Sequence, residues 1–138
     1  MKRLLGLAGL SAVLALGLMG CAATQNPTSG CSLTNVLSVG PTAATADHAA
    51  TAPGNQAQFQ ATLAPHASAP GCPVPQYIAL VDATWTLSDP LDAQISSAAN
   101  STNGLASCVN AASNPITVTA TYSVSGVMQT QSATLTCK

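Results

Sequence analysis

The chain has 138 residues, of which 47% are hydrophobic, 5% charged and 3% aromatic, and its length fits a single domain. Its basic residues are Lys2, Arg3 and Lys138, and glutamate is absent. Beyond residue 20 one lysine stands against four aspartates, which gives a formal charge of −3. A surface this poor in cations cannot neutralise several phosphates, so the composition excludes nucleic-acid binding.

The first 20 residues have the features of a secretory signal peptide. Lys2 and Arg3 precede an apolar segment from Leu4 to Leu18 that contains three glycines. The alternative is a transmembrane helix, but crossing the hydrocarbon takes about 20 apolar residues and this segment is shorter. We therefore expect residues 1–20 to be removed from the mature protein.

The signal ends in a short motif that indicates how it is cleaved. Leu18-Met19-Gly20-Cys21 resembles the lipobox of bacterial lipoproteins, with an aliphatic residue at −3 and a small residue before the cysteine. The resemblance implies that Cys21 is acylated, and several acyl chains anchor a protein stably where one does not. Because Ala22 rather than aspartate follows, it also implies sorting to the outer membrane or cell surface in a host with two membranes. The alternative is an ordinary signal cut near Ala23.

The mature chain begins with a tether and continues as strands. Residues 21–35 are small and polar, as expected of a tether that follows the acylated cysteine. Apolar and polar residues alternate most clearly in residues 56–63 (QAQFQATL) and 116–122 (ITVTATY), which predicts strands there. The other expected strands are residues 36–39, 77–87, 93–95, 105–109 and 127–137.

The spacing of these strands predicts the fold class. Residues 64–76 carry four prolines, which cannot donate to a strand ladder, so this segment is expected to be a loop. Outside the signal no segment has helical spacing over three turns. About seven short strands in some hundred residues predict an all-β, antiparallel β-sandwich. The inward-facing positions that should form its core are Phe59, Trp85, Ile95, Val118 and Leu135.

Six short pieces, taken in their order and spacing, match the pattern of a known family: Leu37-Ser38-Val39-Gly40-Pro41, Pro53-Gly54-Asn55, Phe59-Gln60-Ala61-Thr62, Ala83-Thr84-Trp85-Thr86-Leu87-Ser88-Asp89-Pro90, Gly104-Leu105-Ala106 and Ile116-Thr117-Val118-Thr119-Ala120. Through them residues 36–136 resemble a bacterial immunoglobulin-like domain of the group-two kind. The resemblance implies an immunoglobulin-like β-sandwich over residues 36–138 that serves adhesion, envelope structure or protein interaction without catalysis. The proline-rich insertion around Cys72 and the cysteines themselves depart from the usual pattern of the family.

Four cysteines remain once Cys21 is set aside for acylation. An even number in an exported domain implies two disulfides, for which three connectivities exist. In the expected sandwich, Cys31 and Cys72 fall at one end, whereas Cys108 and Cys137 fall at the other. This placement favours the pairs Cys31–Cys72 and Cys108–Cys137.

The sequence offers little support for catalysis or for a metal site. It has two histidines, His48 and His66, and neither a C-x-x-C spacing nor a G-x-S-x-G elbow. The pair Asp47-His48 lies in an Ala/Thr-rich stretch, which is typical of a solvated loop. We expect no catalytic residue, cofactor or metal. The remaining carboxylates belong to Asp82, Asp89 and Asp92. An outward strand position explains Asp82, and turn capping explains Asp89 and Asp92, better than glycoside hydrolysis or calcium binding does.

Recognition by a sandwich fold usually takes place on its loops or exposed sheet faces. The loop Pro65–Gln76 is the longest and is stiffened by proline, and the expected link of Cys72 to Cys31 would reduce the entropy lost on binding. Pro73, Pro75 and Tyr77 are therefore candidate contacts for an unknown protein or glycan partner, unless the loop is an insertion without function. The alternative role for the whole protein is a periplasm-facing lipoprotein that binds a ligand or assists an enzyme.

Overall fold

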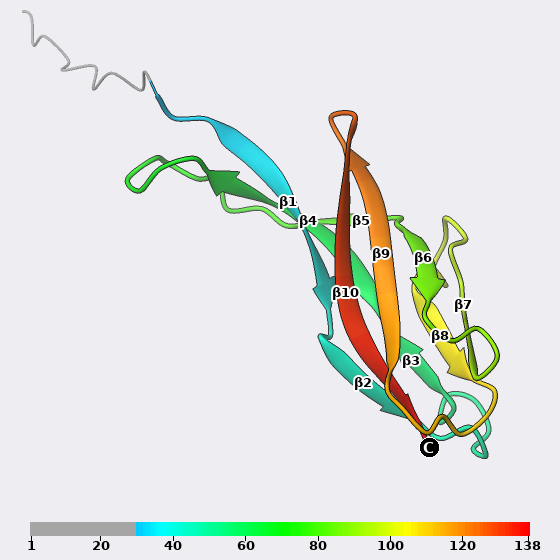
Figure 1. Ribbon diagram of the computed structural model, residues 1–138. Coiled ribbons are helices and arrows are strands. Elements are labelled where there is room, and N and C mark those ends of the chain that lie inside the picture. Colours follow the sequence, from blue (N-terminus) through cyan, green and yellow to red (C-terminus); the bar gives the residue numbers. More distant parts are fainter. Residues whose placement is uncertain (1–29) are drawn as a thin grey trace, which may run out of the picture.

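The computed structural model describes residues 30–138, so the expected signal peptide, Cys21 and most of the expected tether lie outside the described residues. All regular elements of residues 30–138 are strands, and this part of the chain has no helix long and apolar enough to cross a membrane. The strands are β1 (Leu33–Gly40), β2 (Ala43–Ala46), β3 (Gln56–Gln58), β4 (Gln60–Ala67), β5 (Ala79–Val81), β6 (Thr84–Leu87), β7 (Ala93–Ile95), β8 (Leu105–Cys108), β9 (Ile116–Val124) and β10 (Val127–Cys137) (Figure 1).

The strands form three sheets, in the orders β1-β4-β5, β2-β10-β9-β6 and β3-β8-β7. Every pairing is antiparallel except that of β2 with β10, in which Ala43 lies opposite Thr134 and Ala46 opposite Cys137. Only Phe59 separates β3 from β4, so one continuous stretch of chain joins two of the sheets. The expected all-β class with antiparallel pairing is confirmed.

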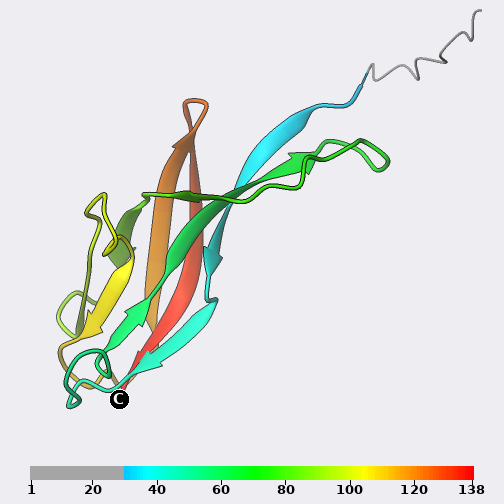
Figure 2. The ribbon, with the colours of Figure 1, turned by 180° about the vertical axis from the view of Figure 1, so that it is seen from behind.

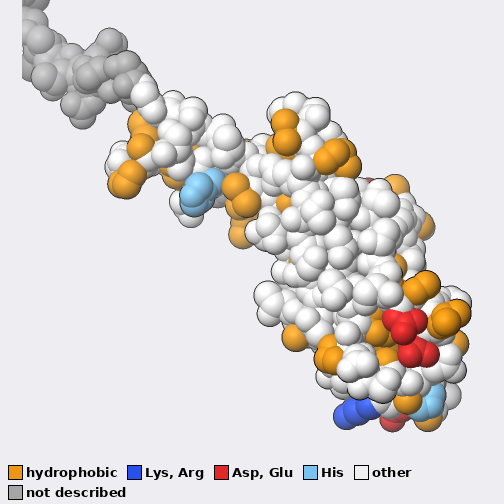
Figure 3. Space-filling view, in the orientation of Figure 1, with side chains coloured by type: hydrophobic (Ala, Val, Ile, Leu, Met, Phe, Trp, Pro, Cys, Tyr) orange, Lys and Arg blue, Asp and Glu red, His pale blue; other side chains and the backbone are white. Residues whose placement is uncertain are grey.

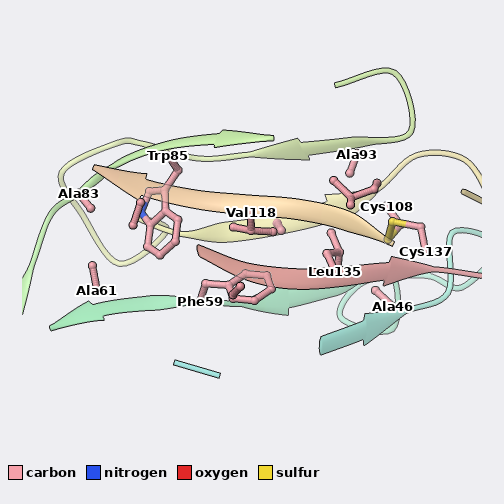
Figure 4. Close-up of a cluster of buried hydrophobic side chains, with 14 of the residues drawn as sticks. Ala46, Phe59, Ala61, Ala83, Trp85, Ala93, Cys108, Val118, Leu135 and Cys137 are labelled. Carbon is pink, nitrogen blue, oxygen red and sulfur yellow. A yellow bond between two sulfur atoms is a disulfide. The ribbon is translucent and has the colours of Figure 1, made fainter. Parts of the chain in front are cut away.

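One core is shared by all three sheets. Trp85 from β6 and Phe59 point toward one another, with ring centroids 6.3 Å apart and planes tilted by 44° (Figure 4). Four of the five expected core residues are buried, whereas Ile95 is only half-buried, because it lies at the margin of the core. Much of the core is alanine, which explains how a chain so rich in alanine folds without helices. The buried hydrophobic residues are Leu37, Ala46, Phe59, Ala61, Ala83, Trp85, Ala93, Ala106, Cys108, Ile116, Val118, Ala120, Ala133, Leu135 and Cys137.

The expected strand over residues 77–87 is two strands that belong to different sheets. β5 pairs with β4, whereas β6 pairs with β9, and the chain passes from one sheet to the other at Asp82-Ala83. The alternation of inward and outward residues continues through this crossing, so the periodicity of the sequence cannot reveal it. β2 was not among the expected strands, since Ala43–Ala46 contains only alanine and threonine.

The expected loop over residues 64–76 is also wrong in its first part, because β4 continues through Pro65 to Ala67. The N–H of Ser68 donates to the Ser32 carbonyl at 2.9 Å, on the β1 side of the strand. Backbone groups alternate between the two sides of a strand, so the nitrogen of Pro65 faces the other side. There β5 pairs with β4 only at residues 61–63, and the missing N–H of proline costs no ladder hydrogen bond. Opposite this extension, β1 begins at Leu33, inside the expected tether.

Candidate functional site

The part of the molecule that stands apart is a two-stranded ribbon that projects beyond the rest of the domain (Figures 1 and 2). We call residues 30–36 and 64–77 the arm, and the other described residues the body. The boundary is sharp along β1: Leu37 is 1% exposed, whereas Leu33 is 47% exposed. Among residues 30–138 no third strand pairs with the arm, which is held by its own hydrogen bonds, by a disulfide and by a side chain of β10.

The tip of the arm is held by the Cys31–Cys72 disulfide, whose Cα atoms are 5.7 Å apart. Next to it the N–H of Ser32 donates to Ser68 Oγ at 3.0 Å, and the N–H of Ser68 donates back to the Ser32 carbonyl. The disulfide pairing expected from the sequence is confirmed here. Covalent and hydrogen-bonded links together tie the segment after β4 to the start of β1.

The root of the arm is held by Gln129, a residue of β10. Its Oε1 accepts a hydrogen bond from the N–H of Leu37 at 2.7 Å, and its Nε2 donates to the carbonyl of Asn35 at 2.8 Å. The side-chain amide thus takes the place that the peptide group of another strand would occupy on the free edge of β1. Each of the two bonds stabilises this junction by about 0.5–1.5 kcal/mol. On β10, Gln129 shares the parity of the buried Ala133 and Leu135, so the alternation of the strand indicates that it faces inward. Nothing in the sequence indicates that β1 is its partner.

The three contact residues expected from the sequence lie on the segment that returns from the tip of the arm. Pro73, Pro75 and Tyr77 are all exposed, and the hydroxyl of Tyr77 donates to Asn35 Oδ1 at 3.2 Å. That bond closes the returning segment against β1. A shallow hollow lies between the end of β4 and this segment, and His66 and Val74 are among the residues that line it. The structure thus brings the expected contacts together on the arm.

The opposite end of the molecule carries the other disulfide and the C-terminus. Cys108 on β8 and Cys137 on β10 are both buried, with Cα atoms 5.5 Å apart, and this pairing is likewise confirmed. Nearby, His48 donates to the Lys138 carbonyl from its backbone N–H at 2.9 Å and from Nδ1 at 2.8 Å. Asp47 Oδ1 accepts the N–H of Ala49 at 2.9 Å. Asp47 and His48 therefore have structural partners in a turn and at the chain end.

The other acids are dispersed. Asp89 Oδ1 accepts the N–H groups of Leu91 at 3.0 Å and Asp92 at 3.4 Å, which is turn capping. Asp82 is exposed at the crossing from β5 to β6. Nowhere in residues 30–138 do three His, Cys, Asp or Glu side chains gather so that they could hold a metal ion.

Trp85 is a structural residue rather than a platform for a ligand. Its Nε1 donates to Asn103 Oδ1 at 2.7 Å, and Asn103 Nδ2 donates to the Ala83 carbonyl at 3.1 Å. A buried tryptophan needs such a partner for its one polar atom. The next residue, Gly104, has φ of +78°, and a Cβ there would overlap the Phe59 carbonyl oxygen. The Asn103-Gly104 turn thus serves the core.

No model of a known protein family matches the sequence, and no curated protein matches it either. The function must be inferred from the residues themselves, and the arm is the part of the structure that is least explained by the stability of the core.

Proposed function

We propose that the protein is a lipid-anchored, non-catalytic immunoglobulin-like module of the bacterial cell envelope, with a role in adhesion, envelope structure or protein interaction. The observation that carries the proposal is the lipobox-like Leu18-Met19-Gly20-Cys21 directly ahead of a disulfide-stapled β-domain. Cys21 is also the one cysteine of five that takes part in neither disulfide. An odd cysteine in an exported protein calls for a separate explanation, and acylation supplies one.

The proposal includes an immunoglobulin-like sandwich, which is supported by the order of the strands. In that fold strands A, B, E and D form one layer, and strands C, F and G the other. With the stretch β3–β4 as strand B, the neighbours β1, β4 and β3, β8, β7 follow the order A-B-E-D. The neighbours β6, β9 and β10 follow C-F-G, and the buried Trp85 lies on β6, which is strand C of this scheme.

Two features distinguish this chain from the usual pattern. The second disulfide joins β8 to β10, whereas the conserved disulfide of antibody domains joins strands B and F. Residues 68–77 of the arm and β5 are additional elements between the strands that we equate with B and C. Both additions suggest a subfamily that stabilises itself with its own disulfides.

The anchoring is tested by a single substitution in the full-length chain expressed in a bacterial host. We expect the wild-type protein to incorporate labelled fatty acid and to sediment with membranes, and the Cys21→Ser variant to do neither. The matched control is Cys31→Ser, which removes a neighbouring cysteine and should keep the label. Label retained by Cys21→Ser, or absent from the wild-type protein, would refute the anchor. Digestion of intact cells with protease then tells a surface-exposed protein from one that faces the periplasm.

A further inference from the structure

Most of the charge and most of the exposed apolar surface of the described residues lie at opposite ends of the molecule. Asp47, Asp89, Asp92 and Lys138 lie in the loops and chain end near the buried disulfide, and Figure 3 shows the charged side chains gathered toward that end. Neither the arm nor the tip of the β9–β10 hairpin (residues 124–128) carries an aspartate, glutamate, lysine or arginine. Asp82, the fifth charged residue of the described part of the chain, lies at the crossing from β5 to β6, toward the end that carries the arm and the hairpin tip.

Most of the exposed large apolar side chains lie at the end that carries the arm and the hairpin tip. Leu91 and Val109 lie at the opposite end, near Asp92 and the C-terminus, which we call the charged end. The arm and the hairpin tip both lie at the end opposite the C-terminus in the two ribbon views. Ile78, directly after the arm, is 75% exposed, and Met128 at the hairpin tip is 63% exposed. We call the following set the apolar end: Leu33, Val36, Tyr77, Ile78, Val127 and Met128.

The geometry of the arm fits immersion in a fluid phase better than docking on a flat protein surface. Leu33 and Val36 have opposite parity on β1, so apolar side chains leave both faces of the ribbon. Tyr77 adds an aromatic ring with a polar tip, the chemistry that is enriched where membrane meets water. The arm also has open strand edges, whose backbone groups need water or headgroups, so its depth is that of the headgroup region and not of the hydrocarbon.

The position of Cys21 in the chain indicates that this fluid phase is a lipid bilayer. The described residues begin at Gly30, next to the disulfide at the tip of the arm, and Cys21 lies nine residues earlier. Nine residues span at most about 30 Å when fully extended, so acylation of Cys21 keeps the arm close to the bilayer. Such tethering raises the effective concentration of the apolar end at the lipid surface, and contacts that are weak on their own become stable.

We propose that the apolar end rests in the headgroup region of the bilayer that holds the acyl chains of Cys21, so that the charged end points away from the membrane. This inference rests on the anchoring proposed above. It assigns the contact surface expected around Pro65–Gln76 to lipid, and it leaves the charged end free to meet other partners.

The test places a tryptophan at each end of the acylated, full-length protein in phosphatidylcholine vesicles that carry bromine on their acyl chains. Ile78→Trp and Met128→Trp probe the apolar end, and both positions are exposed enough to accept the larger ring. The matched control is Leu91→Trp, at a position 80% exposed at the charged end. The native Trp85 is buried and provides the background signal. We expect brominated lipid to quench the added tryptophan at positions 78 and 128, and to leave that at position 91 unchanged.

Flotation of the wild-type protein with the vesicles separates the two proposals. If the protein does not float, the anchor fails and the orientation fails with it. If it floats but neither Ile78→Trp nor Met128→Trp is quenched, the orientation alone is wrong. Equal quenching in all three variants would mean that the domain has no preferred face, which also overturns the inference. Emission at positions 78 and 128 that depends on protein concentration and not on bromine would assign the apolar end to a second copy of the chain.

Discussion

The two disulfides of this protein lie in contrasting surroundings. Cys108 and Cys137 are 2% and 1% exposed and belong to the core of the body, whereas Cys31 is exposed at the tip of the arm. All of the buried hydrophobic residues belong to the body, which therefore has a core in addition to its cross-link. The arm has no core of its own, so its covalent link and a few hydrogen bonds replace hydrophobic burial. A short two-stranded ribbon is only marginally stable in water without such support.

The two disulfides should differ most in how easily a reductant reaches their sulfur atoms. We expect a mild thiol reductant under native conditions to open Cys31–Cys72 completely and to leave Cys108–Cys137 intact, because the attacking thiolate must reach a sulfur atom. Alkylation of the newly formed thiols followed by peptide mass spectrometry measures the result. The same treatment in strong denaturant, in which both pairs should react, is the control. Simultaneous loss of both disulfides under native conditions would contradict the distinction between arm and body.

Removal of each disulfide by substitution compares their contributions to stability. In the chain-entropy model, loops of 41 and 29 residues each contribute roughly 3–4 kcal/mol. The double variant Cys108→Ala/Cys137→Ala also loses buried volume in the core, so its free energy of unfolding should fall by the larger amount. Cys31→Ala/Cys72→Ala should cost less, and urea unfolding of both variants gives the difference. An equal or reversed order would show that the arm folds as an integral part of the body.

Within the body, the contact of Trp85 with Asn103 is expected to contribute next. Asn103→Ala leaves the indole N–H and the Ala83 carbonyl without their partner and should cost about 1–3 kcal/mol. Thermal or urea unfolding followed by tryptophan fluorescence reports both the loss of stability and a changed environment of Trp85. The nearby Asn100→Ala, whose hydrogen bonds are confined to an exposed turn, is the control and should cost less.

The junction between arm and body should show the smallest change in global stability. Gln129→Ala removes two hydrogen bonds to β1 and should lower the free energy of unfolding by about 1–2 kcal/mol. Its clearer effect is local: faster amide hydrogen exchange at Leu37, whose N–H loses its partner, with unchanged exchange in the rest of the body. Gln131→Ala, two residues along the same strand, is the matched control. Unchanged exchange at Leu37 in Gln129→Ala would show that the amide does not fix the arm.

Much of the secondary structure was predictable because strands alternate their side chains between two faces. Residues 93–95 and 127–137 are strands with the expected limits, and the phase of Phe59, Val118 and Leu135 correctly places them in the core. The disulfide pairs also followed from the order of the strands. Alternation states which way a side chain points, but not which strand lies alongside. For that reason the change of sheet at Asp82-Ala83 had no signature in the sequence.

The arm likewise has features that the sequence predicted and features that it could not predict. Proline content and length singled out the region that became the arm, and Tyr77 was expected to be exposed there. The continuation of β4 through Pro65 was not predictable, because it requires that the edge faced by the proline nitrogen has no partner. The role of Gln129 was equally hidden, since its contacts with β1 join residues 92 and 94 positions apart in the chain.

By itself, the sequence determined the all-β class, the alternation that selects the core and the cysteines available for pairing. Each of these features depends only on the types of residues and on their spacing along the chain, so it can be predicted from the sequence. The tertiary structure alone decided where β1 and β4 extend beyond the body. It also decided which edge of β1 has no partner strand, and that the side chain of Gln129 forms hydrogen bonds with that edge. Those outcomes depend on the distance between strands that are remote in sequence, and hydrophobic periodicity carries no information about that distance.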